Sequence, residues 1–203
     1  MSPSSGSQAA NVNPSVSSYY VTDAFYQALV DAFTGWDRDD LAIADPGVRD
    51  SCRALLEREA RYLDQGRHDD WLALFVPECA YWVPGTAERG DPRREITFAF
   101  HDRRQMEDRV YRHGTGYAWS QQPVSRTVRM VSNVEAFATD DPDYVMVRST
   151  FQVTEFRDGD IRPWTGWTGH RLRRQDGGGW LIAAKQVNLI DCDQNIRNPS
   201  ITL

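Results

Sequence analysis

The sequence has few cysteines and no long apolar run. Only three cysteines occur among 203 residues, and Cys52, Cys79 and Cys192 are widely spaced. An odd number of distant cysteines favours free thiols in a reducing cytoplasm over a disulfide framework. No apolar run approaches the roughly 20 residues that a membrane-spanning helix requires. These absences argue against both a disulfide-stapled secreted domain and a membrane protein.

Positive charge is not in excess either. The formal net charge is −6, and acidic residues are interleaved with the local clusters of arginine. Binding to nucleic acid needs clustered positive charge, so this balance argues against such a partner. The sequence also lacks a GxSxG nucleophile elbow, a phosphate-cradling glycine loop and a dinucleotide-binding fingerprint.

The chain is long enough for one domain with a sizeable core. Its 40% hydrophobic and 26% charged residues are ordinary for a globular protein, and 203 residues fit a single domain. The first residues have neither the basic start nor the apolar middle of a secretory signal. We expect a disordered or loosely attached arm over residues 1–20 and one folded domain over residues 21–203.

Apolar spacing predicts helices early in the chain and strands later. Apolar residues recur at helical spacing over residues 21–33 and 52–63, and a short helix is expected over residues 68–75. Strand patterns with turn signals between them are found at residues 78–85, 95–100, 125–137, 144–157, 161–174 and 180–191. Helices followed by long antiparallel strands indicate an α+β fold, with the helices packed on one face of a curved sheet.

A charged helix is predicted between the two groups of strands. Asp102 can cap this helix, and Gln105 stands three residues later, as in a capping box. Met106 and Val110 form a short apolar stripe, and Gly114 allows the helix to end. The many arginines around this narrow stripe suggest a surface that touches another protein or lines a polar cleft.

Several short motifs occur in an order that resembles a known family. The run YWVP follows a helix–turn–helix, and DRRQMEDRV, TGYAW, PVSRT and VSNV come after it in that order. A Gly-rich hairpin then precedes a strand that begins with tryptophan. Together, over residues 51–190, these features resemble the small (β) subunit of aromatic-ring-hydroxylating dioxygenases, which are Rieske non-haem iron oxygenases.

The resemblance implies a cone-shaped fold like that of nuclear transport factor 2, with a strongly curved, mixed but mostly antiparallel sheet wrapped around N-terminal helices. It also implies a non-catalytic β subunit in an α3β3 hexamer, whose α subunits dihydroxylate an aromatic compound during its catabolism. The α subunit would carry the Rieske [2Fe–2S] cluster and the mononuclear Fe(II), and NADH would supply electrons through a reductase and ferredoxin. The implied partners are the α subunit and the other β subunits of a trimer.

The residues of this chain offer no ligand signature for these cofactors. A Rieske centre needs two closely spaced Cys–His pairs, whereas no histidine lies within a few residues of any cysteine. A mononuclear iron needs two histidines and a carboxylate, and His68, His101, His113 and His170 are scattered. Asp102 and His113 share a helix face but lie about 16 Å apart at roughly 1.5 Å per residue. These spacings leave open only a metal site assembled from several elements. Because no ligand signature is present, we predict no metal, cofactor or catalytic residue in this chain.

The alternative is a cofactor-free dehydratase or isomerase that uses the cavity of the same fold for acid–base chemistry. Its candidate residues are Tyr62, Asp64, His113, Tyr117 and His170. Each also has a structural explanation. His113 stands in the last helical turn, where a cation favours the helix dipole, and His170 alternates with polar neighbours and would then be exposed. We favour the structural explanations.

The many aromatic and arginine residues support an interaction role, because tryptophan, tyrosine and arginine are enriched at binding hot spots. The aromatic loop that contains Tyr117 and Trp119 has two interpretations. It either contacts a partner or folds back over the open end of the cone. The predicted subunit contacts are Trp82, Arg103, Arg104, Arg109, Tyr117, Trp119 and Arg126.

Overall fold

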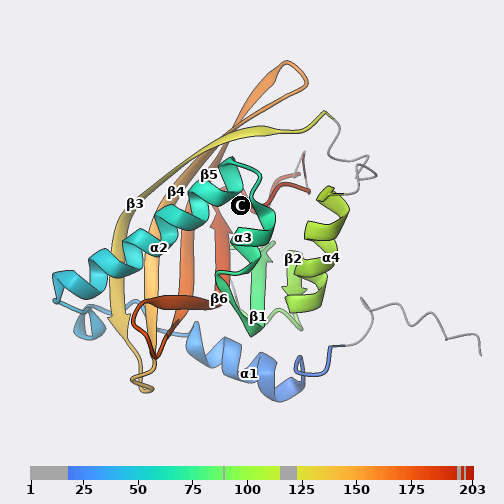
Figure 1. Ribbon diagram of the computed structural model, residues 1–203. Coiled ribbons are helices and arrows are strands. Elements are labelled where there is room, and N and C mark those ends of the chain that lie inside the picture. Colours follow the sequence, from blue (N-terminus) through green and yellow to red (C-terminus); the bar gives the residue numbers. More distant parts are fainter. Residues whose placement is uncertain (1–17, 89, 115–122, 196–197, 199) are drawn as a thin grey trace, which may run out of the picture.

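A six-stranded sheet forms the wall of the molecule in the computed structural model, which describes residues 18–88, 90–114, 123–195, 198 and 200–203 (Figure 1). The strand order across the sheet is β2-β1-β6-β5-β4-β3. Strands β1 and β6 pair in parallel, and the other neighbouring strands pair antiparallel. The bounds are β1 Phe75–Pro84, β2 Thr97–Asp102, β3 Arg126–Ala138, β4 Tyr144–Arg157, β5 Asp160–Arg174 and β6 Trp180–Leu189.

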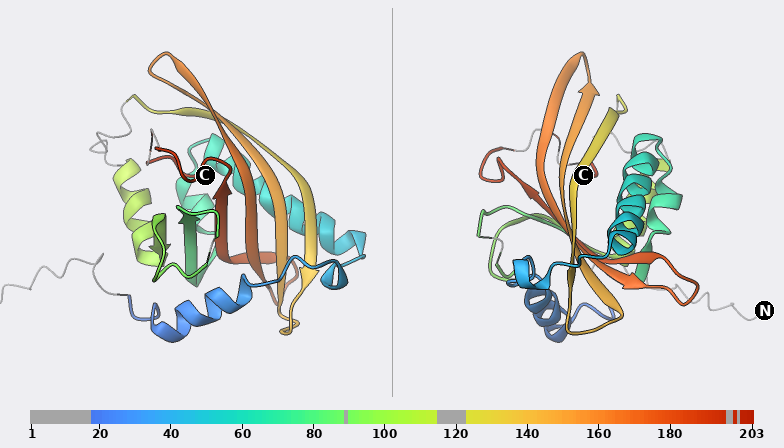
Figure 2. Two further views of the ribbon diagram at one scale, coloured as in Figure 1. Left: turned by 180° about the vertical axis from the view of Figure 1, so that it is seen from behind. Right: turned by 90° about the vertical axis from the view of Figure 1, so that its left-hand side faces the viewer.

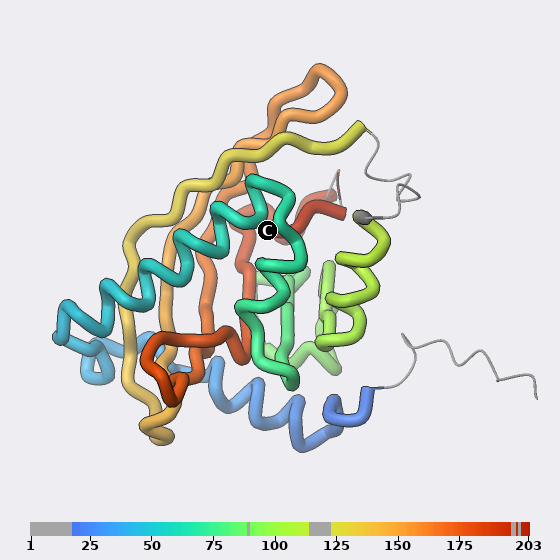
Figure 3. The backbone as a smooth tube through the Cα atoms, in the orientation of Figure 1, coloured from blue at the N-terminus to red at the C-terminus, as the bar shows by residue number. Residues whose placement is uncertain are grey.

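Three helices lie inside the bend of this sheet and one lies outside it. The helices are α1 Asp23–Ala32, α2 Pro46–Asp64, α3 His68–Leu72 and α4 Arg103–Gly114, with a 3₁₀ turn, η1, at Asp39–Leu41. Figure 2 shows the sheet strongly curved, with α2 running along its concave face and α1 below its other face. The tube in Figure 3 follows the same path from the N-terminal helices to the long strands. The predicted α+β fold, with a curved and mostly antiparallel sheet, is confirmed.

Local sequence signals set the helix ends. Helix α2 begins at Pro46, a residue preorganised for the first helical position, and the Asp45 carboxylate accepts a hydrogen bond of 2.8 Å from the Gly47 amide. At α4, the main-chain N–H of Gln105 donates to Asp102 Oδ1 at 2.8 Å, and the main-chain N–H of Asp102 donates to Gln105 Oε1 at 2.9 Å. The capping box predicted for α4 is therefore confirmed.

The main core lies between the concave face of the sheet and α2, α3 and α4. The apolar stripe of α2 packs there, and Met106 and Val110 hold α4 down, as predicted. Strand β5 contributes Gly166 at a point where β6 passes closely. A Cβ atom at Gly166 would overlap the carbonyl oxygen of Asn188, so only glycine fits the pairing of these two strands.

A second apolar cluster lies on the outer face of the sheet, under α1. Leu29 of α1 packs there against Trp82 and Ala80 of β1 and Ala184 of β6. Alternate side chains of β1 point to the two faces, and both faces are covered. This packing leaves Trp82 only 1% exposed. Helix α1 therefore already covers this side chain within the single chain, and the predicted subunit contact of Trp82 stays a prediction.

The folded body begins before residue 21. Tyr20 is buried, and its hydroxyl donates to the carbonyl oxygen of Cys79 at 2.8 Å and accepts from the Arg103 amide at 2.6 Å. Tyr20, the last residue of the predicted arm, is thus held against Cys79 and Arg103, while residues 1–17 lie outside the described part. Within the described ranges, no helix is both long and apolar enough to cross a membrane. Cys52, Cys79 and Cys192 are free thiols.

Candidate functional site

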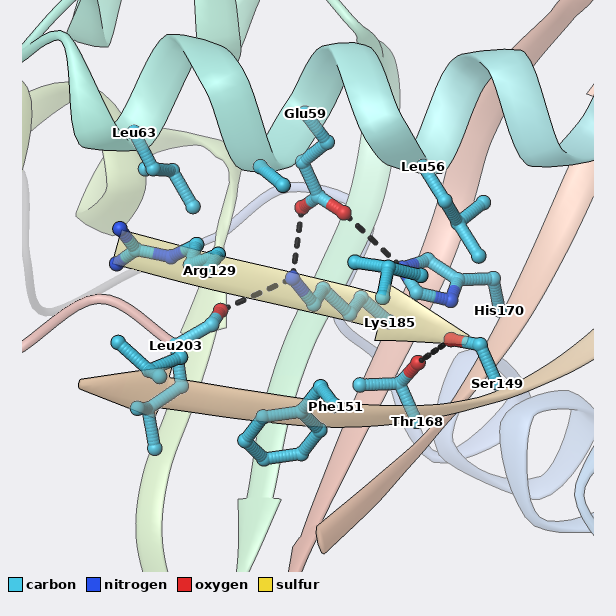
Figure 4. Close-up of a pocket in the computed structure, with 13 residues that line it drawn as sticks. Leu56, Glu59, Leu63, Arg129, Ser149, Phe151, Thr168, His170, Lys185 and Leu203 are labelled. Atoms are coloured by element: carbon cyan, nitrogen blue, oxygen red, sulfur yellow. Dashed lines mark hydrogen bonds and ion pairs between the residues drawn. The ribbon is translucent and has the colours of Figure 1, made fainter. Parts of the chain in front are cut away.

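The concave face encloses a small cavity between α2 and strands β3 to β6 (Figure 4). Its volume is about 30 Å³, which is room for one or two water molecules. Leu56 and Leu63 of α2 and Phe151 and Val153 of β4 form apolar walls, and Leu203 closes one side. The remaining wall is polar and carries a buried charged group, which makes this cavity the candidate site.

Three titratable side chains from different elements meet at the polar wall. Lys185 of β6 donates a hydrogen bond from Nζ to Glu59 Oε1 at 2.8 Å. The His170 Nε2 of β5 lies 3.2 Å from Glu59 Oε2, and Trp71 Nε1 donates to Glu59 Oε1 at 3.1 Å. Glu59 is 3% exposed, Lys185 5% and His170 1%. The Glu59 carboxylate therefore has a partner on each oxygen.

The positions of these residues follow from periodicity. Glu59 stands four residues after Leu55 and four before Leu63, so the winding of α2 places it on the buried face. Lys185 and His170 face each other across the β5–β6 ladder. The sequence does hold one signal for this cluster, because Lys185 is the only lysine in the chain while arginine occurs 22 times.

Burial and pairing set the charges in this cluster. Burial alone would raise the pKa of Glu59, but the Lys185 ammonium and the His170 hydrogen bond hold that pKa below its usual range. Burial lowers the pKa of His170 against the opposing pull of Glu59, and burial likewise lowers the pKa of Lys185. We read the cluster as a carboxylate–ammonium pair beside a neutral imidazole.

One ring nitrogen in the cavity has no partner among the described residues. His170 Nδ1 is buried without a hydrogen bond. Figure 4 shows this side of the ring turned toward the hydroxyl pair of Ser149 and Thr168, whose oxygens lie 2.8 Å apart. A buried polar atom without a partner costs free energy. The cavity therefore has one unmet hydrogen-bonding requirement.

The segment Ser200–Leu203, here called the tail segment, runs over the cavity. Lys185 Nζ donates to the Leu203 carbonyl oxygen at 2.9 Å. The Tyr81 hydroxyl donates to the same oxygen at 3.1 Å and accepts from the Leu203 amide at 3.0 Å. Arg129 donates to the Thr202 carbonyl oxygen. The tail segment is thus held through its main chain by basic and hydroxyl groups of the cone.

Arg109, a predicted contact, also binds the tail segment. Its Nη2 donates to the carbonyl oxygens of Ser200 at 2.5 Å and Ile201 at 2.7 Å. Burial lowers the pKa of this guanidinium. Arg103 likewise turns inward, with hydrogen bonds from Nη1 to the carbonyl oxygens of Leu72 at 2.9 Å and Phe75 at 3.3 Å. The structure does not test subunit contact, but it gives both arginines a role within the chain.

The side chains of the other predicted contacts, Arg104 and Arg126, differ in their exposure to solvent. Arg104 lies 3.8 Å from the Asp102 carboxylate, and its Nε is buried without a hydrogen bond among the described residues. Arg126 is exposed on β3, and its guanidinium lies 4.5 Å from the ring centroid of Phe156. Tyr117 and Trp119 lie outside the described residues. Among the predicted contacts that the structure describes, Arg126 is therefore the one that most clearly faces outward.

The residues proposed for acid–base chemistry do not form one site. His170 is in the cavity, and the expectation that it would be exposed is wrong. Asp64 instead pairs with Arg129 at the edge of the cone, and Tyr62 lies under the Arg67 guanidinium at 4.3 Å. His113 stacks on His68 with ring centroids 4.6 Å apart. Within the described ranges, no group of three or more His, Cys, Asp or Glu side chains could hold a metal ion.

Comparison with known proteins identifies the family. Residues 58–194 match the model of the ring hydroxylating beta subunit. The small oxygenase component of the p-cumate 2,3-dioxygenase system of Pseudomonas putida is 33% identical over 132 residues, which is 64% of this chain and 73% of that protein. The 3-phenylpropionate/cinnamic acid dioxygenase β subunit of Photorhabdus laumondii is 30% identical over 158 residues, which is 72% of this chain and 87% of that protein.

Solved structures give the same fold. A naphthalene 1,2-dioxygenase structure with bound indole aligns with a TM-score of 0.69 and 19% identity, over 90% of this chain and 95% of that one. A nuclear transport factor 2-like protein of Novosphingobium aromaticivorans, with a cystatin-like fold, aligns with a TM-score of 0.51 and 16% identity. The alignment covers 76% of this chain and 88% of that one. The predicted cone-shaped fold is thereby confirmed. From its fold and from the match of residues 58–194, the chain belongs to the β subunits of aromatic-ring-hydroxylating dioxygenases.

Proposed function

We propose that this chain is the non-catalytic β subunit of the terminal oxygenase of an aromatic-ring-hydroxylating dioxygenase. The observation that carries this proposal is the family match over residues 58–194, which spans the C-terminal end of α2 and the whole sheet. The named relatives are small or β subunits of dioxygenases. The closed cone interior supports a scaffolding role, because its charged groups bind one another and the tail segment rather than facing an open cavity.

The full assembly in this proposal is an α3β3 hexamer in the cytoplasm. Three β subunits form a trimer that holds three α subunits. Each α subunit carries a Rieske [2Fe–2S] cluster and a mononuclear Fe(II), and dihydroxylates an aromatic compound in its catabolism. Electrons from NADH reach the α subunit through a reductase and a ferredoxin. The β subunit holds the α subunits in position and stabilises the complex.

A surface on the outer face of β3, β4 and β5 suits contact with another subunit. Cross-strand pairing places Arg126, Phe156 and Ile161 in one row. Val128 and Met130 continue along β3, which is an edge strand of the sheet. Val128 is 65% exposed, Met130 56% and Ile161 65%. We call these five residues the outer-face patch. Exposed apolar side chains beside an arginine are typical of interfaces.

Co-expression with the large subunit tests the proposal. We expect the two chains to co-purify in equal amounts, with the mass of a hexamer by light scattering and with all the iron in the complex. The β chain purified alone should be colourless. If the β chain does not bind the large subunit, or alone converts a carbonyl substrate as a dehydratase or isomerase would, the proposal is wrong.

A further inference from the structure

We propose that a surface cavity on the outer face of the sheet binds a small organic carboxylate. The cavity lies between residues 25–29 of α1 and residues 171–173 of β5, and we call it the α1 cavity. Figure 2 shows α1 along this face. Its volume of about 400 Å³ is within the range of small-molecule sites. The site goes beyond the proposed scaffold function and does not depend on it, because its groups belong to one chain.

Irregular pairing of three strands shapes the α1 cavity. Strand β6 pairs through Ile182 and Ala184 with both of its neighbours, β1 and β5, and both ladders skip Ala183. On β1, residues 76–79 stand opposite this single residue, so the strand bulges there, and Pro77 and Glu78 of the bulge line the cavity. Bulges redirect side chains and are common next to active sites. The hollow is therefore built into the pairing of the sheet.

Two arginines that line the α1 cavity have no partner of opposite charge. Arg171 and Arg173 are two positions apart on β5, so they share its outer face. Arg171 is half-buried, and its guanidinium lies 4.0 Å from the ring centroid of Tyr144, a stacking that leaves its N–H edge available. Within the described ranges neither arginine forms an ion pair or a hydrogen bond, and the residues outside those ranges contain no aspartate or glutamate. Both guanidinium groups are therefore available to an anion.

The charges around the α1 cavity favour a ligand with one negative charge. The cavity is lined by two cations, Arg171 and Arg173, and by one carboxylate, the exposed Glu78, so one positive charge is in excess. Arginine binds a carboxylate through two parallel hydrogen bonds. A neighbouring cavity, which shares Arg171, is lined by three acidic residues, Asp31, Asp140 and Asp141. Their charge opposes an anion on that side of Arg171 and leaves the side near Arg173 for the carboxylate.

Apolar side chains form the rest of the α1 cavity. Phe25 and Leu29 of α1, Val76 of β1 and Ala184 of β6 all line it. Leu29, Val76 and Ala184 are buried, so packing fixes their positions. Covering this apolar surface with a hydrocarbon group is favourable, whereas a bare inorganic anion would leave it without contacts. The ligand class is therefore a carboxylate with a compact apolar group.

Methionine methyl groups provide a measurement that locates the ligand. The chain has four methionines, and labelling the full chain with ¹³C-methyl methionine gives each one a resonance that a Met→Leu variant assigns. Met146 stands opposite Arg171 across the β4–β5 ladder and lines the neighbouring cavity beside it. Met106 lies in the main core and Met130 in the outer-face patch, so these two serve as internal controls.

Three small molecules separate the contribution of charge from that of apolar contact. Phenylacetate is the probe, phenylacetamide is the uncharged control of the same shape, and acetate is the anion without an apolar body, all at constant ionic strength. We expect a saturable shift of the Met146 methyl resonance with phenylacetate, while the Met106 and Met130 resonances stay in place. Phenylacetamide and acetate should each need concentrations about tenfold higher or more for the same shift.

An arginine substitution with a matched control tests the charged side of the site. We expect Arg171→Gln to raise the Kd for phenylacetate about tenfold or more, because it removes a hydrogen bond between charged groups. Arg174 is an exposed arginine of the same strand whose guanidinium lies over the Trp180 ring. Arg174→Gln makes the same change of charge outside the cavity lining, so it should leave Kd unchanged.

A second pair of variants tests the shape of the site. Ala28 is exposed on α1 and lines the α1 cavity, so Ala28→Leu fills the cavity without disturbing the core. We expect this variant to raise Kd about tenfold or more, because the ligand loses its apolar contacts. Ala24 is also exposed on α1 but lies outside the cavity lining. Ala24→Leu should therefore leave Kd unchanged.

Three results would overturn the proposed site. One is the absence of a saturable Met146 shift with phenylacetate in a chain whose amide spectrum shows that it is folded. Another is equal affinity for phenylacetate and phenylacetamide, which would remove the role of the arginines. The third is a wild-type Kd in Arg171→Gln or Ala28→Leu, which would place the ligand elsewhere. No second subunit is needed, so failure here is distinct from failure of the co-purification experiment.

Discussion

Lys185 and Glu59 form a buried ion pair that joins β6 to α2, with Nζ and Oε1 2.8 Å apart. They are 126 positions apart in the sequence. Removing two charges from water costs several kcal/mol per ion, and their attraction offsets this cost only when the remaining hydrogen bonds are also formed. Trp71, His170 and the Leu203 carbonyl oxygen supply those bonds. The pair therefore fixes the helix on the sheet and the tail segment over both.

Breaking this pair should be strongly destabilising. We expect Glu59→Gln and Lys185→Met each to lower the free energy of unfolding by about 3–5 kcal/mol, because each leaves a buried charge without its partner. Urea denaturation measures the loss. The double variant should lose less than the sum of the two single variants, by about 1.5 kcal/mol or more. The exposed Arg53→Ala, which breaks an ion pair on the surface of α2, is the control and should cost less than about 1 kcal/mol.

His101 should make stability depend on pH. Burial, with the nearby Arg109 guanidinium, lowers the pKa of His101 to about 4. In the unfolded chain a histidine has a pKa of about 6.5, so below this pH the unfolded state binds a proton that the folded state does not. Stability is therefore lost as pH falls from about 6.5 toward 4, by about 1–2 kcal/mol at pH 5.

The variant His101→Gln isolates this contribution. Urea denaturation of both proteins at about pH 7 and about pH 5 gives two differences in unfolding free energy. We expect the wild type to lose more stability than His101→Gln over this interval, by about 1–2 kcal/mol. Equal losses would show that His101 is already protonated in the folded state at pH 5.

The capping box of α4 gives a prediction with a matched control. Asp102→Ala removes the acceptor of the Gln105 amide and should cost about 1 kcal/mol in unfolding free energy. Asp102→Asn keeps an acceptor oxygen and should retain most of that stability, since asparagine caps helices about as well as aspartate. If both variants lose the same amount, the charge of Asp102 matters rather than its cap.

Local patterns account for most of the elements. Apolar residues recur every three to four positions in α2 and every two in the long strands, so burial follows from spacing. The capping box is readable because Asp102 and Gln105 are three residues apart. What the local patterns miss depends on distant partners. Trp82 is buried by α1, which lies about fifty residues earlier, and no local pattern of β1 reveals which element covers its second face.

The buried polar cluster was missed for the same reason. Glu59 fits the buried stripe of α2 by spacing, but a carboxylate within such a stripe is ordinarily read as solvent-exposed, since charged residues are rarely buried without a partner. Its partners His170 and Lys185 come from strands more than a hundred residues later. Only the presence of a single lysine in an arginine-rich chain marks this position in the sequence.

The outer-face patch should be required for assembly but not for folding. Val128 is 65% exposed in the single chain, so Val128→Glu adds a charge to a surface that water already reaches. We expect its unfolding free energy to change by less than about 0.5 kcal/mol. In a subunit interface, the same charge would be buried without a partner. Co-expression with the large subunit, followed by light scattering, should then show at least tenfold less hexamer.

Val128→Thr is the matched control for this experiment. Threonine keeps the β-branched shape that suits an edge strand and adds no charge, so the hexamer should form as in the wild type. Arg126→Ala, in the same patch, should give an intermediate loss. If Val128→Glu assembles normally while remaining folded, this face of the sheet lies outside the subunit contacts, and the partner must bind another surface of the cone.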